Sequence, residues 1–452
     1  MIDIKRLREN LEEMRRAIHL RSVDPSKTDL DRWLALDQRR RQLKAALDAC
    51  NAEKKAADRL WRDDPEAARL RGQELRQQSR ELEQQLTDAT REWQQILDWL
   101  PNWPHPDMPK GEGEGDNVEE CAWIPGTGYL DRTQLGTGTH TASLMPRRPC
   151  HADGDDFEPL HHLDLGERLG GLDTAQAGAV SGTRFAYILG DTARLYHGLQ
   201  QVLVERLLSE GFEPIIPPLL VRERALYGTS HFPEGRDQVY RIASDNVEEG
   251  NQLFLVGSSE PSNFSYFMDR VLPEAELPVR LFASTPCFRS EAGAGGRDVR
   301  GIKRLHQFDK VEMNAVCTPE QAEEIYEEFR AINEWLLQTL ELPYRIVDKC
   351  GGDAGYLASH RQRDVEAWLP GQREFMEVMT DTNAADYQAR RLNIRYRAAG
   401  GSVRFCHTVN DTGCAPGRLL IAIFEHYQQA DGSVMVPAAL RRFAGKDSIR
   451  PQ

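Results

Sequence analysis

Charged and aromatic residues at two-residue spacing stand on either side of a glycine-rich segment in the second half of the chain. Arg289 and Glu291 precede the segment, and Phe308, Lys310 and Glu312 follow it. Residues two apart in a strand share a face, so two strands joined by a reversing loop would present all five side chains together. A guanidinium can clamp a phosphate, an aromatic ring can stack on a base, and a buried carboxylate can receive an ammonium group. The spacing therefore indicates a site that holds a nucleotide beside an amino acid.

A second interpretation of the same residues is a surface hairpin held by cross-strand ion pairs. The glycine-rich segment itself does not decide between the two. The GAGG at 293–296 is not followed by the Gly-Lys-Ser/Thr of a phosphate-binding P-loop, and an isolated glycine cluster does not indicate a dinucleotide fold. A nucleotide site here would therefore have to be built on a sheet face.

The elements that would position these residues begin near residue 160. An amphipathic helix is predicted over 192–210, and short strand-like runs alternate with helical segments after it. These runs are PIIPPLLV, QLFLVG, VRLFAS, FDKVEMNAV, YRIVD, EFMEVMT and LLIAIF, the last of which could continue into a helix. Strands separated partly by hairpins and partly by helices predict an α+β domain with a mainly antiparallel sheet flanked by helices.

The first hundred residues have the composition of long helices. From residue 29 to residue 100 there is one proline, Pro65, and one glycine, Gly72. Apolar residues recur at seven-residue spacing in both halves, which is typical of a coiled-coil seam. The seam positions are Leu36, Leu43, Cys50 and Ala57, then Leu75, Leu82, Ala89 and Ile96, with Leu47, Leu86, Trp93 and Leu100 between them and Ser79 the polar member. We therefore predict an antiparallel helical hairpin that reverses at Asp63-Asp64-Pro65; a helical pair that only docks on the core or dimerises remains open.

The predicted hairpin has balanced charge, with 15 basic and 15 acidic side chains between residues 27 and 100. Local clusters could still bind phosphate groups. The candidates are Arg39, Arg40, Arg41, Lys54 and Lys55. A short run of like charges is also typical of a solvated helix face.

Composition limits the class of protein. The 452 residues carry 57 basic and 71 acidic side chains, a net charge of −14, which argues against coating nucleic acid, DNA included, through the whole surface. Eight cysteines without a CxxC pair indicate neither a disulfide framework nor a zinc site. The start lacks an apolar signal core and no apolar run is long enough to span a membrane, so we expect a soluble, cytoplasmic protein.

Composition also suggests where the domain boundaries lie. The segment at 101–117 holds four prolines and three glycines, which cannot continue a helix. Residues 122–156 show no clear periodicity and are predicted as an irregular insertion. We expect an N-terminal domain at 1–104, a linker with the insertion at 105–159, and the main domain at 160–452.

Two long motifs resemble those of the class II seryl-tRNA synthetases. TPCFRSEAG at 285–293 together with HQFDKVE at 306–312 is similar to that family's motif 2, and GRLLIAIFEHYQQADG at 417–432 is similar to its motif 3. The resemblance extends over nearly the whole chain, from MIDIKRLREN at the start through PIIPPLLVRERALYGT and QARRLNIRYR, and leaves out mainly the insertion. It implies an N-terminal tRNA-binding hairpin and a catalytic domain built on an antiparallel sheet.

The resemblance implies roles for the residues of the first site. Arg289 would bind the α-phosphate of ATP, Glu291 would contact the adenine side, and Arg304 would hold the γ-phosphate. Phe308 would stack on adenine, with Arg418 on the other face of the base. Arg289, Glu291 and Arg418 would be the catalytic residues. The implied ATP-binding set also includes Ser290, Leu305, Glu377, Val378, Met379 and Thr380.

The resemblance also implies a serine site and a metal site. Glu312 would receive the serine ammonium group, and Thr412 would take the family's position at the serine side chain. Glu377 would hold Mg²⁺ between phosphates, with Thr380 at the neighbouring hydroxyl position. The full implied serine-binding set is Ser258, Ser259, Glu260, Arg289, Glu312, Asn410 and Thr412.

The implied reaction is ATP-dependent formation of seryl-adenylate followed by transfer of the seryl group to the 3′ end of tRNA(Ser); tRNA(Sec) is a further implied substrate. The family's hairpin reaches the tRNA held by the partner subunit, which implies a homodimer. No membrane partner is implied.

Departures from the family pattern cluster around the amino acid. Ser258-Ser259-Glu260 stands where the family usually has Thr-Ala-Glu, and Glu377 to Asn383 reads EVMTDTN instead of EISSCSN. Thr412 replaces a usual Ser, and Asp411, Cys414 and Pro416 are also unusual. Each hydroxyl exchange keeps a hydrogen-bond donor and acceptor, whereas the added charge of Asp381 could reshape the pocket.

Three other functions remain open on these residues. The first is a specialised copy of the enzyme that resists a seryl-adenylate-like inhibitor or supplies seryl-tRNA to a biosynthetic pathway. The second is a ligase that loads a small amino acid on a carrier protein, although such relatives lack the hairpin. The third is an inactive binding protein of the same fold, which would have no reason to keep buried charges that are costly to desolvate.

Overall fold

The computed structural model describes residues 1–451 apart from 60–64, 136–140, 153–156, 244–250 and 293–299. The chain divides into two compact units, Met1–Trp103 and Pro104–Gln452. No helix in the described residues is long and apolar enough to cross a membrane.

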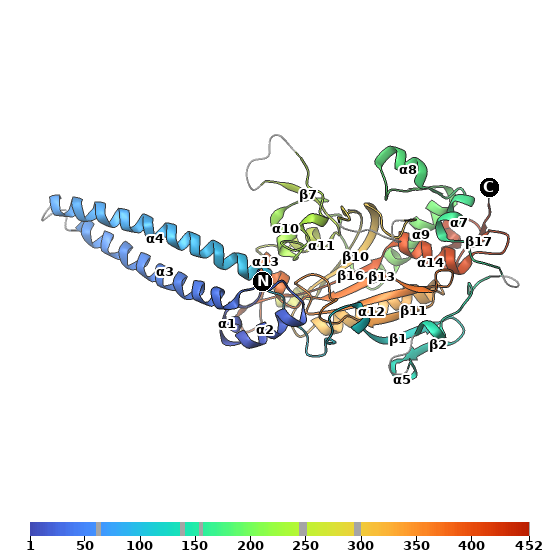
Figure 1. The fold of residues 1–452 in the computed structure, drawn as a ribbon, viewed down its shortest axis with the longest axis horizontal. Helices are drawn as coiled ribbons and strands as arrows, with labels where there is room; N and C mark the ends of the chain where they lie inside the picture. The colour runs from blue at the N-terminus through green and yellow to red at the C-terminus, as the bar shows by residue number, and fades with distance from the viewer. Residues whose placement is uncertain (60–64, 136–140, 153–156, 244–250, 293–299, 452) are drawn as a thin grey trace. The chain divides into compact units, whose positions relative to one another are not determined.

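The N-terminal unit is helical. Short helices α1 (Ile4–Glu9) and α2 (Leu11–Leu20) precede the long helices α3 (Leu30–Arg59) and α4 (Pro65–Trp99), which run side by side (Figure 1). The predicted helical pair is therefore confirmed. Pro65 opens α4, where its missing N–H is harmless, and the rest of the predicted reversal lies outside the described residues.

The seam between α3 and α4 buries most of the predicted apolar positions. Its buried members are Leu43, Leu47, Cys50, Ala57, Ala68, Leu75, Ser79, Ala89, Trp93 and Leu97. Ser79 satisfies its hydroxyl locally by donating to Glu83 Oε1 at 3.2 Å. At the end of α4, Leu97 is fully buried and the predicted Ile96 is only half-buried.

The second unit is built on a nine-stranded sheet of order β2-β1-β11-β12-β13-β16-β10-β9-β5. Only the short contact between β5 and β9 is parallel. The strands are β1 (Val118–Ile124), β2 (Gly128–Asp131), β5 (Glu213–Pro214), β9 (Val279–Phe288), β10 (Gln307–Cys317), β11 (Tyr344–Asp348), β12 (Arg361–Leu369), β13 (Glu374–Asn383) and β16 (His407–Cys414). The predicted α+β class is confirmed.

Helices and small sheets surround this central sheet (Figure 1). The helices are α5 (Arg132–Leu135), α6 (Thr141–Leu144), α7 (His162–Arg168), α8 (Thr174–Ser181), α9 (Gly190–Ser209), α10 (Glu223–Gly228), α11 (Glu260–Ser265), α12 (Ala322–Thr339), α13 (Tyr387–Leu392), α14 (Pro416–Tyr427) and α15 (Arg441–Ala444). The remaining strands are β3 (Leu172–Asp173) with β4 (Tyr187–Ile188), β6 (Leu220–Arg222) with β7 (Leu253–Leu255), β8 (Val271–Pro273) with β14 (Arg395–Arg397) and β15 (Val403–Phe405), and β17 (Val434–Met435) with β18 (Ser448–Ile449).

Helix α12 covers one face of the central sheet because its apolar residues repeat every three or four positions. Ile325, Phe329, Ile332 and Leu336 are buried along this stripe. They pack in one core with Met313 of β10 and with residues of the neighbouring strands. The opposite face of β10, β13 and β16 is left for the polar residues described below.

Three sequence-based assignments need correction. LLIAIF is not a strand, because it forms the buried helix α14, which begins at Pro416. An apolar run buried on all sides has no periodicity that separates helix from strand. Strands β12 and β16 were not predicted. Part of the insertion is regular, because β1 pairs with β2 and with β11.

Candidate functional site

Strand β10 carries Phe308, Lys310 and Glu312 on one face, as the alternation predicts. Its neighbour β9 ends at Phe288, opposite Gln307. Arg289 and Glu291 therefore do not share a strand face, which corrects the prediction. They follow the strand end, and Glu291 adopts a left-handed backbone with φ of 51°. This turn still brings both side chains to the cavity beside β10.

The first cavity lies beside Phe308 and has about 700 Å³ of empty space. It contains eight of the residues predicted to bind ATP: Arg289, Glu291, Arg304, Leu305, Phe308, Glu377, Val378 and Arg418. Three other predicted residues lie outside its lining, of which Thr380 lines the second cavity described below. The Ser290 backbone N–H donates to the carbonyl of Gln238 at 2.9 Å, and Met379 is fully buried in the core.

The arginine side chains of this cavity contact an aromatic ring or carboxylates. The guanidinium carbon of Arg289 lies 5.4 Å from the centroid of the Phe308 ring. Arg304 contacts the Glu291 carboxylate. Arg418 Nη1 lies 2.8 Å from Oε1 of Glu377. A bound polyphosphate could exchange these carboxylate partners for phosphate oxygens.

The second cavity adjoins the first. It is lined by Ser258, Glu260, Glu312, Thr380, Asn410 and further polar residues. Four residues line both cavities: Arg289, Lys310, Glu377 and Thr412. Ser259 is fully buried outside this lining, where its hydroxyl accepts from Asn263 Nδ2 at 3.3 Å. A nucleoside triphosphate in the first cavity and a small polar ligand in the second would meet at these shared residues.

Two buried carboxyl groups face the second cavity. Glu312 forms an ion pair with Lys310, whose Nζ also lies 3.4 Å from Thr412 Oγ1. Burial raises the pKa of Glu312, and Lys310 opposes that rise. Burial, with the neighbouring charge of Glu312, raises the pKa of Glu260 to about 8. Gln388 Nε2 donates to Glu260 Oε1 at 2.6 Å and opposes the rise in the pKa of Glu260.

A β-bulge in β13 brings Glu377 and Thr380 to the same face. Residues three apart normally point to opposite faces, but Val378 is skipped in the pairing of β13 with β12, which shifts the register. Thr380 Oγ1 then lies 2.8 Å from Oδ1 of Asp364 and 3.1 Å from Oε1 of Glu377. Asp364 was not predicted from the sequence, although charged and apolar residues alternate around it in RDVEAWL.

The donor set fits Mg²⁺. Three side-chain oxygens meet at Thr380, whose hydroxyl donates to both carboxylates, and oxygen is the ligand type that Mg²⁺ takes. Burial and the charge of Glu377 raise the pKa of Asp364 to about 7, and Lys349, whose Nζ lies 2.9 Å from Asp364 Oδ2, opposes that rise. Among the described residues no three His, Cys, Asp or Glu side chains could hold a metal ion. Mg²⁺ commonly binds through one or two carboxylates and substrate phosphates.

The unusual residues Asp381 and Asp411 do not face the ligand cavities. They are direct cross-strand partners on β13 and β16, both fully buried. Asp411 Oδ2 accepts from Asn333 Nδ2 on α12 at 2.7 Å, and Asp381 lies 3.8 Å from Arg363 Nη1. The expectation that the charge of Asp381 reshapes the pocket is therefore wrong, because the side chain points to the opposite face of the sheet.

The predicted phosphate-binding residues of the hairpin differ in their contacts. Arg39 donates to Gln85, Arg40 lies over the Trp93 ring at 3.9 Å, and Arg41 pairs with buried Asp37 at 3.3 Å. Lys54 is half-buried near the seam and Lys55 is exposed. The arginines thus have structural partners within the helical unit.

Comparisons with known proteins cover both units. A family model described as Seryl-tRNA synthetase N-terminal domain matches residues 1–104. A second, described as tRNA synthetase class II core domain (G, H, P, S and T), matches residues 240–427.

Full-length relatives agree with these matches. Serine–tRNA ligase of Dictyoglomus turgidum is 37% identical over 457 aligned positions that cover 100% of both chains. Crystal structures of a seryl-tRNA synthetase from Pyrococcus horikoshii complexed with ATP (33% identity, TM-score 0.86, 100% of both chains) and of a cytoplasmic serine–tRNA ligase from Naegleria fowleri with AMP (26% identity, TM-score 0.80, 98% and 96% of the chains) have the same fold.

Proposed function

Since this chain belongs to the seryl-tRNA synthetase family, we propose that it is a serine–tRNA ligase that activates L-serine with ATP and transfers the seryl group to tRNA(Ser). The observation that carries the proposal is the adjacency of the two cavities, which share Arg289, Lys310, Glu377 and Thr412. A nucleotide in the first cavity would present its α-phosphate to an amino acid in the second.

The first step joins the two substrates. The serine carboxylate attacks the α-phosphorus of ATP, a P–O bond forms, and pyrophosphate leaves with the electrons of the broken bond. Arg289 at the junction would neutralise the α-phosphate, and Arg304 and Arg418 would bind the other phosphates and the base. Glu312 and Glu260 would hold the ammonium group. In the second step a terminal ribose hydroxyl of the tRNA attacks the carbonyl carbon, and AMP leaves. Positioning and charge neutralisation supply the rate without a covalent nucleophile.

Mg²⁺ would be held by Glu377 and Thr380, with Asp364 beside them. The meeting of the Thr380 hydroxyl with the two carboxylates supports this assignment. When bound, the ion would neutralise phosphate charge. The bulge at Val378 brings the Glu377 and Thr380 side chains that would hold the ion to the same face of the sheet.

Two further parts of the proposal concern assembly. We assign the helical unit to tRNA binding, because the model of the seryl-tRNA synthetase N-terminal domain matches residues 1–104 and the motif resemblance implies a tRNA-binding hairpin there. We also assign a homodimer in the cytoplasm. The segment after β5 supports the dimer, since Ile216 is 99% exposed and Leu208 and Leu220 are half-exposed nearby in the chain. Light scattering should give a dimeric mass for the unmodified protein and a mass closer to the monomer for Ile216→Asp. An unchanged dimeric mass in the variant would contradict a role of Ile216 in the dimer interface.

The test of the function is acylation of unfractionated tRNA by the purified protein with ATP and labelled serine, run beside threonine, alanine, glycine and cysteine. Serine alone appearing on tRNA is the expected result. Serine-dependent exchange of pyrophosphate into ATP without charged tRNA would favour a carrier-protein ligase. Absence of both reactions would favour an inactive binding protein.

A further inference from the structure

A short segment of irregular backbone, residues 301–305, forms one wall of the first cavity. Ile302, Lys303, Arg304 and Leu305 all line this cavity. The segment follows the glycine-rich part of the chain and leads into β10, and it belongs to neither a helix nor a strand. Since no regular backbone pairing holds the segment, other contacts must fix the position of Arg304 at the cavity.

The imidazole of His162 holds the start of this segment. His162 is the first residue of helix α7, which packs beside α14 (Figure 1), and it is only 2% exposed. Its Nε2 accepts from the backbone N–H of Ile302 at 3.3 Å. Within the described residues this is the only hydrogen bond of the ring, because Nδ1 is buried without a partner. The contact between His162 and Ile302 therefore joins α7 to the cavity wall.

Gly301 makes this close approach possible. It adopts a left-handed backbone with φ of 93°, which residues with a side chain rarely adopt. A Cβ at position 301 would overlap His162 Nε2 and lie 2.8 Å from Cε1 of the same ring. A larger residue at position 301 would therefore push the segment away from the imidazole.

The imidazole is held in the neutral form that can accept this hydrogen bond. Burial, with the charges of His161, Arg300 and Lys303, lowers the pKa of His162 to about 3. A protonated ring carries an N–H on both nitrogens and cannot accept from Ile302. The acceptor at Nε2 is therefore present at neutral pH.

A second contact joins α7 to the residue before the segment. Arg300 Nη2 lies 2.5 Å from Asp164 Oδ1, and the two side chains are 58% and 42% exposed. Exposed ion pairs contribute little, because water screens the charges and the long side chains lose entropy. The buried hydrogen bond of His162 is therefore the stronger restraint on this end of the segment.

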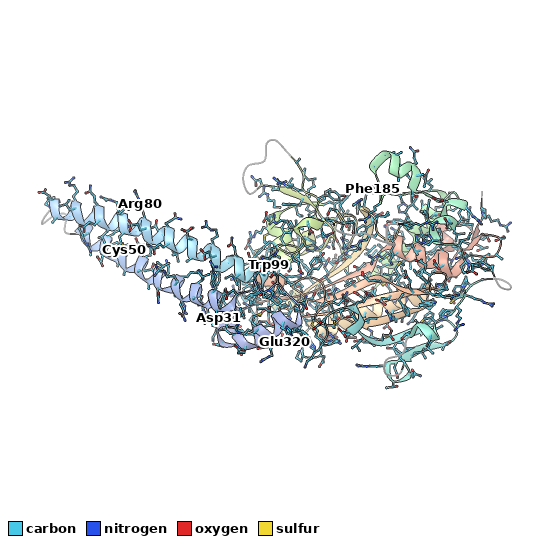
Figure 2. The ribbon with its side chains drawn as sticks, in the orientation of Figure 1. Asp31, Cys50, Arg80, Trp99, Phe185 and Glu320 are labelled. Carbon is cyan, nitrogen blue, oxygen red and sulfur yellow. The ribbon has the colours of Figure 1, made fainter. Side chains whose placement is uncertain are left out.

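The other end of the segment is fixed separately. The backbone N–H of His306 donates to the carbonyl of Arg184 at 3.0 Å. The centroid of the His306 ring lies 5.3 Å from that of Phe185, which Figure 2 labels. The position of Arg304 between the two ends therefore depends on both restraints, and His162 provides the first.

We propose that His162 is a positioning residue for ATP, which through the N–H of Ile302 fixes the cavity wall that presents Arg304 to the phosphates. This inference rests on the proposed function and adds His162 and its partner Gly301 to the residues on which ATP binding depends. His162 is not among the described residues that line the cavity. It therefore acts through the segment and does not touch the ligand.

The test measures the dissociation constant of ATP with Mg²⁺ by titration calorimetry for variants of the full-length protein. His162→Phe keeps an aromatic ring and removes the acceptor, whereas His162→Gln keeps an acceptor oxygen. His161→Phe is the matched control. His161 lies next to His162, with 4.1 Å between the ring centroids, but its Nδ1 accepts from the backbone N–H of Leu163 within α7. Urea denaturation reports on folding, and pyrophosphate exchange gives the KM values for ATP and serine.

His162→Phe is expected to raise the dissociation constant and the KM of ATP by about tenfold, because a buried N–H without its acceptor disfavours the bound position of the segment. The serine KM should stay close to that of the unmodified protein. His162→Gln should recover most of the ATP affinity, and His161→Phe should bind ATP normally. Unchanged ATP affinity in His162→Phe, equal losses in all three variants, or equal increases in both KM values would overturn the inference.

Gly301→Ala tests the same contact from the other side and replaces His162→Phe if that variant does not fold. The added methyl group should weaken ATP binding in the same way, because it displaces Ile302 from the imidazole. The loss in the double variant His162→Phe/Gly301→Ala should be smaller than the product of the two single losses, since both changes act on one contact. Losses that multiply would contradict action through this contact.

Direct ATP binding also separates this inference from the proposed function. ATP binding without serine-dependent pyrophosphate exchange would contradict the proposed ligase, while the dissociation constants would still decide the role of His162. Failure of the unmodified protein to bind ATP would overturn both.

Discussion

Lys310 Nζ lies 2.5 Å from Glu312 Oε2 in a pair whose side chains are only 7% and 1% exposed. The pair sits at the junction of the two cavities, since Lys310 lines both of them. Breaking a buried ion pair by removing one partner leaves an uncompensated charge. The pair therefore links the stability of the sheet to the amino-acid site.

Lys310→Met should lower the unfolding free energy by about 3–5 kcal/mol, measured by urea denaturation. Lys303→Met is the matched control, because Lys303 forms a longer and more exposed pair with Glu374 at 3.6 Å, worth about 0–1 kcal/mol. Equal losses of unfolding free energy in the two variants would contradict a larger contribution from the buried pair.

Glu260 should make serine binding depend on pH. Its pKa is raised to about 8 by burial and by Glu312, so the free protein holds a proton there at pH 7. A bound ammonium group favours the carboxylate, and the proton must leave. The KM for serine should therefore fall by up to about tenfold per pH unit as the pH rises toward 8. The measurement is pyrophosphate exchange at pH 6.5–8.

Glu260→Gln provides the control for that pH profile. Glutamine keeps the size of the side chain but cannot titrate, so the variant should bind serine weakly with a flat pH dependence over the same range. A pH slope that persists in Glu260→Gln would assign the titration to another group.

Thr380→Val and Asp364→Asn should raise the Mg²⁺ concentration needed for half-maximal pyrophosphate exchange. Both remove an oxygen from the cluster around Thr380, and loss of a supporting group at a metal site costs about 10–100-fold in affinity. Asp381→Asn is the matched control, because Asp381 is next in sequence but on the opposite face. A normal Mg²⁺ requirement in Thr380→Val would contradict the assignment.

The Asp381–Asp411 pair should make the protein less stable as the pH rises. Burial raises the pKa of both carboxyl groups well above the ordinary value, with the charge of Asp411 adding to the rise at Asp381 and the charge of Glu312 adding to the rise at Asp411. A carboxyl whose folded pKa is raised stabilises the fold fully only below its unfolded pKa, and this contribution is lost as the pH increases. The urea concentration at the midpoint of unfolding should therefore decrease as the pH is raised from 5 to 9.

Asp381→Asn should make the urea midpoint less dependent on pH, because one of the two titrating carboxyl groups is removed. The serine KM should stay close to that of the unmodified protein, since the side chain points away from the amino-acid cavity. The same pH slope in both proteins would mean that other groups control the stability in this range.

The sequence by itself determined what depends on local periodicity. Alternation placed Phe308, Lys310 and Glu312 on one face of a strand, and the seven-residue repeat predicted the helical pair α3 and α4. Both patterns are read over a few neighbouring residues, where side-chain direction follows from the backbone alone. The motif resemblance added the residue types of the ATP and serine sites.

Tertiary structure decided what depends on register between distant strands. The bulge at Val378 turned Glu377 and Thr380 toward Asp364, and the pairing of β13 with β16 put Asp381 opposite Asp411 on the other face. A shift of one residue exchanges the two faces of a strand. That choice is made by packing between segments tens of residues apart, so no local pattern in the sequence could have specified it.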